Sequence, residues 1–249
     1  MPTTPRRIDY GSDADQYGLL ALPADRTGGR RGGLRPVVVL IHGGFWRARY
    51  GLDLMTDLAE DLVARGYVVW NVEYRRVGQP GGGYPGTLDD VAAAMDALGG
   101  LAGEHGLDLA RVAVVGHSAG GHLGLWAADR SEGVIPAVAV GLAGVVDLVE
   151  AARARLGDDG RAVSDFLGGG PDDEPEAYRG AQPALDGDRV VLVHGTGDDV
   201  VPPSQSIDGA ERSGADLILV DGADHFDVID PASEAWARVV AVLDDRLRP

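Results

Sequence analysis

Six short runs of consecutive apolar residues recur along the chain, each bounded by glycine, proline or polar residues. Uninterrupted apolar runs of this length are typical of strands that are covered on both faces, as in a parallel sheet. They predict strands at residues 37–41, 67–72, 112–115, 137–141, 190–193 and 217–220.

Between the predicted strands, apolar residues recur at intervals of three or four, which is typical of one face of a helix. This spacing predicts a helix ending at Gly66, a second ending before Gly99, a third over residues 122–129 and a C-terminal helix introduced near Ser233. Alternating strands and helices favour right-handed βαβ units. We therefore expect one α/β domain over residues 1–249, with a doubly wound, mostly parallel sheet and helices on both faces.

The alternation breaks at residues 147–188, a stretch rich in glycine, aspartate and proline. It contains no obvious strand and has helical spacing only over residues 148–156 and 175–181. Long excursions between two strands are usually functional or form a small subdomain. We expect a small cap-like insertion near the substrate; a surface excursion with no part in the chemistry is the alternative.

A glycine-flanked serine stands where the strand at 112–115 meets the helix at 122–129. The segment GHSAG at residues 116–120 matches the G-x-S-x-G pattern, in which a tight strand-to-helix turn projects the serine hydroxyl from the sheet. A helix-capping serine after a glycine-rich turn is the structural alternative. The context favours Ser118 as a nucleophile.

A serine hydroxyl needs a base, and in this architecture the chain order is serine, acid, histidine. His225 follows the last predicted strand, in a loop at the carboxyl edge of the sheet where ligands collect. We expect His225 to be the base, and His194 to bond locally and shape the acid loop. Asp198 is the preferred acid, with Asp199 as the fallback. Three further acids near the base are expected to be solvated loop residues: Asp221, Asp224 and Asp227.

Four motifs occur in a familiar order: HGGFW at residues 42–46, GHSAGG at 116–121, HGTGDDVVP at 194–202 and GADHF at 222–226. This combination resembles the α/β-hydrolase esterases with an HGG-type oxyanion loop. That group includes hormone-sensitive-lipase-like esterases and kynurenine formamidase. The resemblance implies an α/β-hydrolase fold.

The resemblance also implies an oxyanion hole made by the backbone N–H groups of Gly44, Phe45 and Ala119, with His42 bracing the loop. Many lipase-like members have a third glycine where Phe45 stands, and the HGG-aromatic-Trp form is closer to the formamidase branch. Trp46 and Phe45 are candidates to line a substrate pocket, with core packing as the alternative.

Two further segments complete the expected site. His117, next to the serine, is a second tentative pocket residue. The segment Glu73-Tyr74-Arg75-Arg76 resembles one whose Tyr-Arg pair supports the oxyanion loop, so we expect it to be structural.

Composition excludes several other classes. The chain has no cysteine, which rules out a thiol nucleophile, a disulfide and a cysteine zinc site. It has no H-E-x-x-H spacing, and the glycines at 81–83 match no phosphate-binding motif, so neither a metal nor another cofactor is expected.

A formal net charge of −17 argues against nucleic acid as a partner. The longest apolar run, residues 134–146, contains Pro136 and is too short to span a bilayer. The N-terminal stretch has no apolar signal region, so a cytoplasmic location is expected.

These features predict a serine hydrolase that cleaves a small to medium carboxylic ester through an acyl-enzyme. Hydrolysis of an aryl formamide, another amide or a peptide would use the same residues. A hydrolase fold that only binds is the hypothesis from another class, because fold alone does not guarantee function. A dehalogenase needs aspartate at the position of Ser118. A homodimer is compatible with the sequence.

Overall fold

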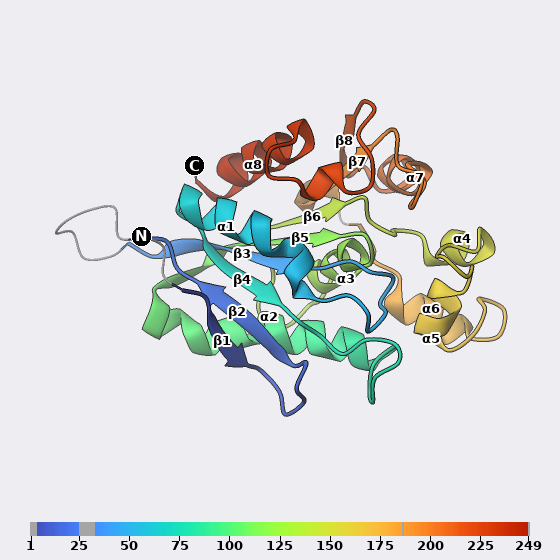
Figure 1. The fold of residues 1–249 in the computed structure, drawn as a ribbon, viewed down its shortest axis with the longest axis horizontal. Coiled ribbons are helices and arrows are strands. Elements are labelled where there is room, and N and C mark those ends of the chain that lie inside the picture. The colour runs from blue at the N-terminus through green and yellow to red at the C-terminus, as the bar shows by residue number, and fades with distance from the viewer. Residues whose placement is uncertain (1–3, 25–32, 186, 249) are drawn as a thin grey trace.

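One sheet organises the molecule (Figure 1). The structure is a computed structural model that describes residues 4–24, 33–185 and 187–248, and in these ranges eight strands pair in the order β1-β2-β4-β3-β5-β6-β7-β8. Only the β1–β2 and β2–β4 pairs are antiparallel, so the predicted mostly parallel sheet is confirmed. The strands are β1 Arg6–Asp9, β2 Tyr17–Ala21, β3 Arg35–Ile41, β4 Val68–Val72, β5 Leu107–His117, β6 Val138–Leu142, β7 Val190–Gly195 and β8 Asp216–Val220.

The six predicted strands correspond to β3 through β8, whereas the sequence analysis missed β1 and β2. The strand β1 lies at one edge of the sheet, is mostly exposed and has no continuous apolar run. The strand β2 does have an apolar sequence, YGLLA, which the sequence analysis overlooked. The strand β5 is longer than predicted, because its first half is partly exposed and polar.

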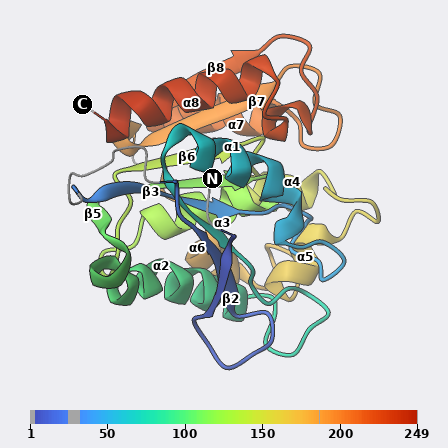
Figure 2. The same ribbon diagram turned by 60° about the vertical axis from the view of Figure 1, so that its left-hand side comes forward.

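Helices cover both faces of the sheet, as predicted (Figure 2). On one face, α1 (Thr56–Arg65) and α8 (Glu234–Leu247) pack their apolar sides against Val38, Leu40 and their neighbours. On the other, α2 (Gly86–His105), α3 (Ala119–Ala128) and α7 (Ser204–Ser213) cover the sheet. The sequence analysis missed α7, whose turns carry mostly polar residues.

The second predicted helix does not end before Gly99. The helix α2 continues to His105 and ends at Gly106, which has a left-handed φ of 64°. Glycine inside a helix costs about 1 kcal/mol but does not stop it. Here a Cβ at Gly99 would meet no neighbouring atom, so the residue requires no special conformation or close approach.

The insertion at residues 147–188 forms three short helices, and its described part contains no strand. They are α4 (Leu148–Arg153), α5 (Ala162–Leu167) and α6 (Pro175–Ala181), and Figure 1 shows them grouped at one end of the sheet. Across the described residues, no helix is both long and apolar enough to cross a membrane.

The sheet reverses its winding between β3 and β5. From β3 the chain moves outward to β4, whereas from β5 it proceeds in the opposite direction to β6. Ligands in open α/β sheets bind at such a switch point, outside the carboxyl ends of the strands. The loop with the HGGFW motif follows β3, and Ser118 follows β5, so both emerge at this point.

Candidate active site

Ser118 occupies the tight turn between β5 and α3. Its backbone angles are φ 55° and ψ −119°, a conformation that non-glycine residues rarely adopt. Backbone strain of this kind persists where the surroundings enforce it, typically at functional sites. The N–H of Ser118 donates to the carbonyl of Leu142 at 2.8 Å, which fixes the turn against β6.

The flanking glycines make the turn possible. A Cβ on Gly116 would stand 2.0 Å from the carbonyl oxygen of Gly120, and a Cβ on Gly120 would stand 2.2 Å from that of Ile41. Both distances are far below van der Waals contact. The strand and the following helix could not pack this closely with any larger residue at either position.

Asp198 and His225 meet in a direct hydrogen bond. The Nδ1 atom of His225 lies 2.7 Å from Oδ2 of Asp198, and both side chains are almost fully buried. The other carboxylate oxygen of Asp198 accepts the backbone N–H groups of Val200 and Val201 at 2.8 and 2.9 Å. The carboxylate is therefore held from two sides and oriented toward the imidazole.

His194 shapes the acid loop, as predicted. Its Nε2 lies 3.2 Å from Oδ2 of Asp198 and 3.0 Å from the carbonyl oxygen of Val201, while its Nδ1 lies 2.7 Å from the hydroxyl of Ser206. Burial alone would raise the pKa of Asp198, but hydrogen bonds from His194 and His225 hold that pKa well below its usual value. The acid is therefore ionised at neutral pH.

His117 connects the loop of His225 to the serine turn. Its Nε2–H donates to the backbone carbonyl of His225 at 3.0 Å, and the two rings lie 4.6 Å apart. No hydrogen bond joins the Ser118 hydroxyl to the His225 ring within the described residues, but catalytic bonds of this type often form only with substrate present. His117 is as buried as Ser118, and its contact with the loop of His225 is a positioning contact. Its place in a substrate pocket stays a prediction from the sequence.

The HGGFW loop lies directly against the serine. A Cβ on Gly43 would stand 2.9 Å from the Cβ of Ser118, and Gly44 and Phe45 both have positive φ, 110° and 53°. Among the hydrogen bonds of the described residues, none uses the N–H of Gly44, Phe45 or Ala119. Three free donors beside a serine are suited to stabilise negative charge on a substrate oxygen.

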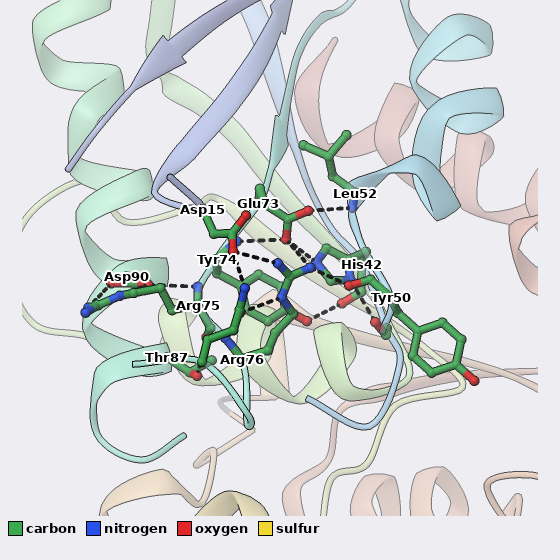
Figure 3. Close-up of polar contacts among 12 residues, drawn as sticks. Asp15, His42, Tyr50, Leu52, Glu73, Tyr74, Arg75, Arg76, Thr87 and Asp90 are labelled. Atoms are coloured by element: carbon green, nitrogen blue, oxygen red, sulfur yellow. Dashed lines mark hydrogen bonds and ion pairs between the residues drawn. The ribbon is translucent and has the colours of Figure 1, made fainter. Parts of the chain in front are cut away.

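A buried hydrogen bond between His42 and Glu73 anchors the base of this loop (Figure 3). The Nε2 of His42 lies 2.9 Å from Oε1 of Glu73, and its Nδ1 lies 2.7 Å from the carbonyl oxygen of Gly43. Burial would raise the pKa of Glu73, but the hydrogen bond from His42 and the charge of Arg76 lower it. The sequence analysis did not identify Glu73 as the partner of His42.

Tyr74 and Arg76 complete the support that the resemblance implied. The hydroxyl of Tyr74 donates to the backbone carbonyl of His42 at 2.8 Å, and its ring stacks on that of His42 at 4.4 Å. Arg76 pairs with Glu73 at 2.8 Å, whereas Arg75 points away and pairs with Asp90 at 2.6 Å. The segment is therefore structural, as predicted, with Arg76 as the arginine that reaches the loop anchor.

Trp46 lies in the core beneath the loop and has no exposed surface. Its ring stacks on Phe166 of α5 at 4.6 Å, and its Nε1–H donates to Nδ1 of His122 at 3.2 Å. The Nε2–H of His122 in turn donates to the carbonyl of Ala181 in α6 at 2.8 Å. Trp46 therefore connects the HGGFW loop to the insertion, and its contacts correspond to the core-packing alternative.

Ion pairs add to this junction. Arg47, the next residue of the loop, lies 2.8 Å from Asp159 and 3.0 Å from Asp165 of the insertion. Arg49 bonds to Asp158 nearby. The insertion is thus packed against the loop that carries the free N–H groups.

Acidification is expected to destabilise the fold through the two buried neutral histidines. Burial lowers the pKa of His117 to about 3 and that of His122 to about 4, whereas an unfolded histidine titrates near 6.5. Between pH 6.5 and about 4, these two rings are therefore protonated in the unfolded state but stay neutral in the folded state. As the pH is lowered through this range, we expect each ring to lower the free energy of unfolding by roughly 1.4 kcal/mol per pH unit. Urea unfolding at pH 7.5, 6.0 and 5.0 measures this slope, and His122→Leu should remove about half of it. A free energy of unfolding that stays flat over this range would contradict the assignment.

The arrangement is suited to nucleophilic attack on a carbonyl carbon. It brings together a strained serine, an imidazole oriented by an ionised carboxylate, and unused N–H donors. In the described part of the chain, no group of three or more histidine, aspartate or glutamate residues is placed to hold a metal ion.

Comparisons with known proteins agree with this chemistry. The sequence model of the BD-FAE family matches residues 28–212, more than half of the chain. Esterase LipC of Mycobacterium tuberculosis is 30% identical over 258 residues, which is 91% of this chain and 61% of that protein. Carboxylesterase NlhH of the same organism is 42% identical over 89 residues, 35% of this chain and 27% of that protein. The chain spans less than two thirds of the length of either relative.

Solved structures share the fold. A truncated form of a carbohydrate esterase from gut microbiota superposes with a TM-score of 0.82 at 20% sequence identity, over 100% of this chain and 97% of that chain. The predicted α/β-hydrolase architecture is confirmed by this likeness.

Proposed function

The chain belongs to the BD-FAE family, and we propose that it is a serine hydrolase that cleaves a small to medium carboxylic ester through an acyl-enzyme. The observation that carries the proposal is the 2.7 Å hydrogen bond between Asp198 and His225, in a loop that His117 ties to the turn of Ser118. The curated relatives LipC and NlhH are named as an esterase and a carboxylesterase. Their names support ester hydrolysis as the reaction.

In the proposed reaction, His225 removes the proton of the Ser118 hydroxyl as the oxygen attacks the acyl carbon. The ester carbonyl becomes an oxyanion, which accepts hydrogen bonds from the N–H groups of Gly44, Phe45 and Ala119. Asp198 holds the imidazole in the correct tautomer and stabilises the positive charge that it acquires. His225 then gives the proton to the leaving alcohol, and water hydrolyses the acyl-enzyme by the same steps in reverse.

We also propose that the insertion forms one wall of the substrate site. Its helix α5 supplies Phe166, which stacks on Trp46 directly beneath the oxyanion loop, and Asp159 and Asp165 pair with Arg47. A segment joined to this loop is well placed to limit the size of the acyl group. The cytoplasmic location remains a prediction from the sequence.

A turnover panel tests the proposed reaction. p-Nitrophenyl esters of increasing acyl length and N-formylkynurenine are assayed with the wild type. We expect turnover of the esters to fall as the acyl chain lengthens, because Trp46 and Phe166 close off space beneath the loop. We expect turnover of the shorter esters to exceed that of the formamide, because the amine of a formamide is a poorer leaving group than p-nitrophenolate. If N-formylkynurenine were turned over and none of the esters were, the substrate would be an aryl formamide and not an ester. No turnover of any compound by folded protein would favour a binding function.

A further inference from the structure

An exposed phenylalanine stands next to the proposed base. Phe226 is 57% exposed, whereas the triad side chains beside it are almost fully buried. Exposure of a large apolar side chain next to a reactive group is informative because water contact with apolar surface is unfavourable. The sequence analysis treated GADHF only as the source of the histidine.

The ring of Phe226 is held in place. It packs edge-to-face on His225 with 5.3 Å between centroids, and its centroid lies 6.1 Å from that of His117. The backbone beneath it is fixed by Asp224, whose carboxylate accepts the N–H groups of Phe226 at 2.7 Å and Asp227 at 2.9 Å. The ring therefore presents one rigid apolar surface toward solvent beside the reaction centre.

The chemistry of the proposed reaction places one part of the substrate near this ring. His225 must give its proton to the oxygen of the leaving alcohol, so that oxygen has to come within hydrogen-bonding distance of the imidazole. The substrate carbonyl oxygen points instead toward the loop of Gly44 and Phe45. A residue fixed on His225 is therefore on the leaving-group side of the ester bond.

We infer that Phe226 forms the subsite for the alcohol part of the substrate and selects esters of apolar alcohols, aromatic ones above all. The inference rests on the proposed function. An aromatic ring of the alcohol stacks on Phe226 and is removed from water there, which lowers the free energy of the transition state. A methyl or ethyl alcohol part is too small to reach the ring. The carboxylate of Asp224, which accepts the backbone N–H of Phe226, disfavours a negatively charged alcohol part nearby.

The test compares ratios of kcat/KM within each variant. We expect Phe226→Ala to lower the benzyl acetate to methyl acetate ratio by about tenfold, and Phe226→Tyr, which keeps the ring, to leave it within about twofold of the wild type. Leu219→Ala on β8 is the matched control, because Leu219 is another exposed large apolar residue, and it should not change the ratio. Thermal unfolding of each variant verifies folding.

A second pair of substrates separates the two sides of the ester bond. The ratio for methyl butyrate against methyl acetate should be the same in Phe226→Ala and wild type. The inference would be overturned if Phe226→Ala left the benzyl acetate to methyl acetate ratio unchanged, or changed the methyl butyrate to methyl acetate ratio instead. Either result would leave the proposed hydrolase function standing. Failure of the proposed function has a different signature, namely turnover that survives Ser118→Ala.

Discussion

Ser118→Ala is expected to lower kcat by about 10⁴- to 10⁶-fold while the free energy of unfolding stays within about 1 kcal/mol of the wild type. The loss follows because no other atom can form the acyl-enzyme. The stability changes little because the Ser118 hydroxyl makes no hydrogen bond within the described residues, so the substitution removes one oxygen atom and no hydrogen bond. Turnover of a p-nitrophenyl ester and urea unfolding measure the two effects.

A serine at the end of α7 supplies the matched control. Ser213 donates its hydroxyl to the carbonyl of Gly209 and lies away from the site, so Ser213→Ala should retain full turnover. Retention of most activity by Ser118→Ala would mean that another group is the nucleophile.

Asp198→Asn is expected to lower kcat by about 10⁴-fold. The N–H groups of Val200 and Val201 face Oδ1, so the asparagine must keep its oxygen there and turn its NH₂ group toward His225. The Nδ1 of His225 then has to accept a hydrogen bond, which moves the ring proton to Nε2. A ring protonated at Nε2 cannot remove the proton of the serine.

Asp199→Asn is the paired control for this substitution. Asp199 is exposed and makes no hydrogen bond or ion pair among the described residues, so its loss should leave kcat within about twofold. The reverse order of effects, with Asp199→Asn the more harmful, would reassign the acid.

The parts of the fold that were predictable from sequence have strong local signals. The strands β3 to β8 carry continuous apolar runs, and the turn at Ser118 requires glycine at two exact places because backbone atoms approach there. Asp198 could be preferred over Asp199 from its position in the loop after β7. In each case the physical requirement acts on neighbouring residues and therefore leaves a readable pattern.

Contacts between distant segments were not predictable in this way. Glu73 reaches His42 across 31 positions of the chain, and Trp46 meets Phe166 across a still longer separation. A buried glutamate or tryptophan has the same local pattern whatever its partner. The exposure of the Phe226 side chain was likewise not predictable, since its neighbours in sequence are ordinary loop residues.

The edge strand β1 and the extent of α2 were missed for a different reason. Tertiary pairing, not local preference, makes the polar segment β1 a strand: Arg7 pairs with Leu19 of β2, which in turn pairs with Asn71 of β4. In α2, the helix passes Gly99 because the favourable packing of its earlier turns outweighs the weak helix preference of glycine.

Labelling with a fluorophosphonate probe tests the central claim most directly, because the probe reacts with a serine only when a base activates it. Intact-mass and peptide mass spectrometry should find one label per chain, located on Ser118, absent in Ser118→Ala and formed far more slowly in Asp198→Asn. A label on any other residue, or no label on folded wild-type protein, would contradict the proposed triad.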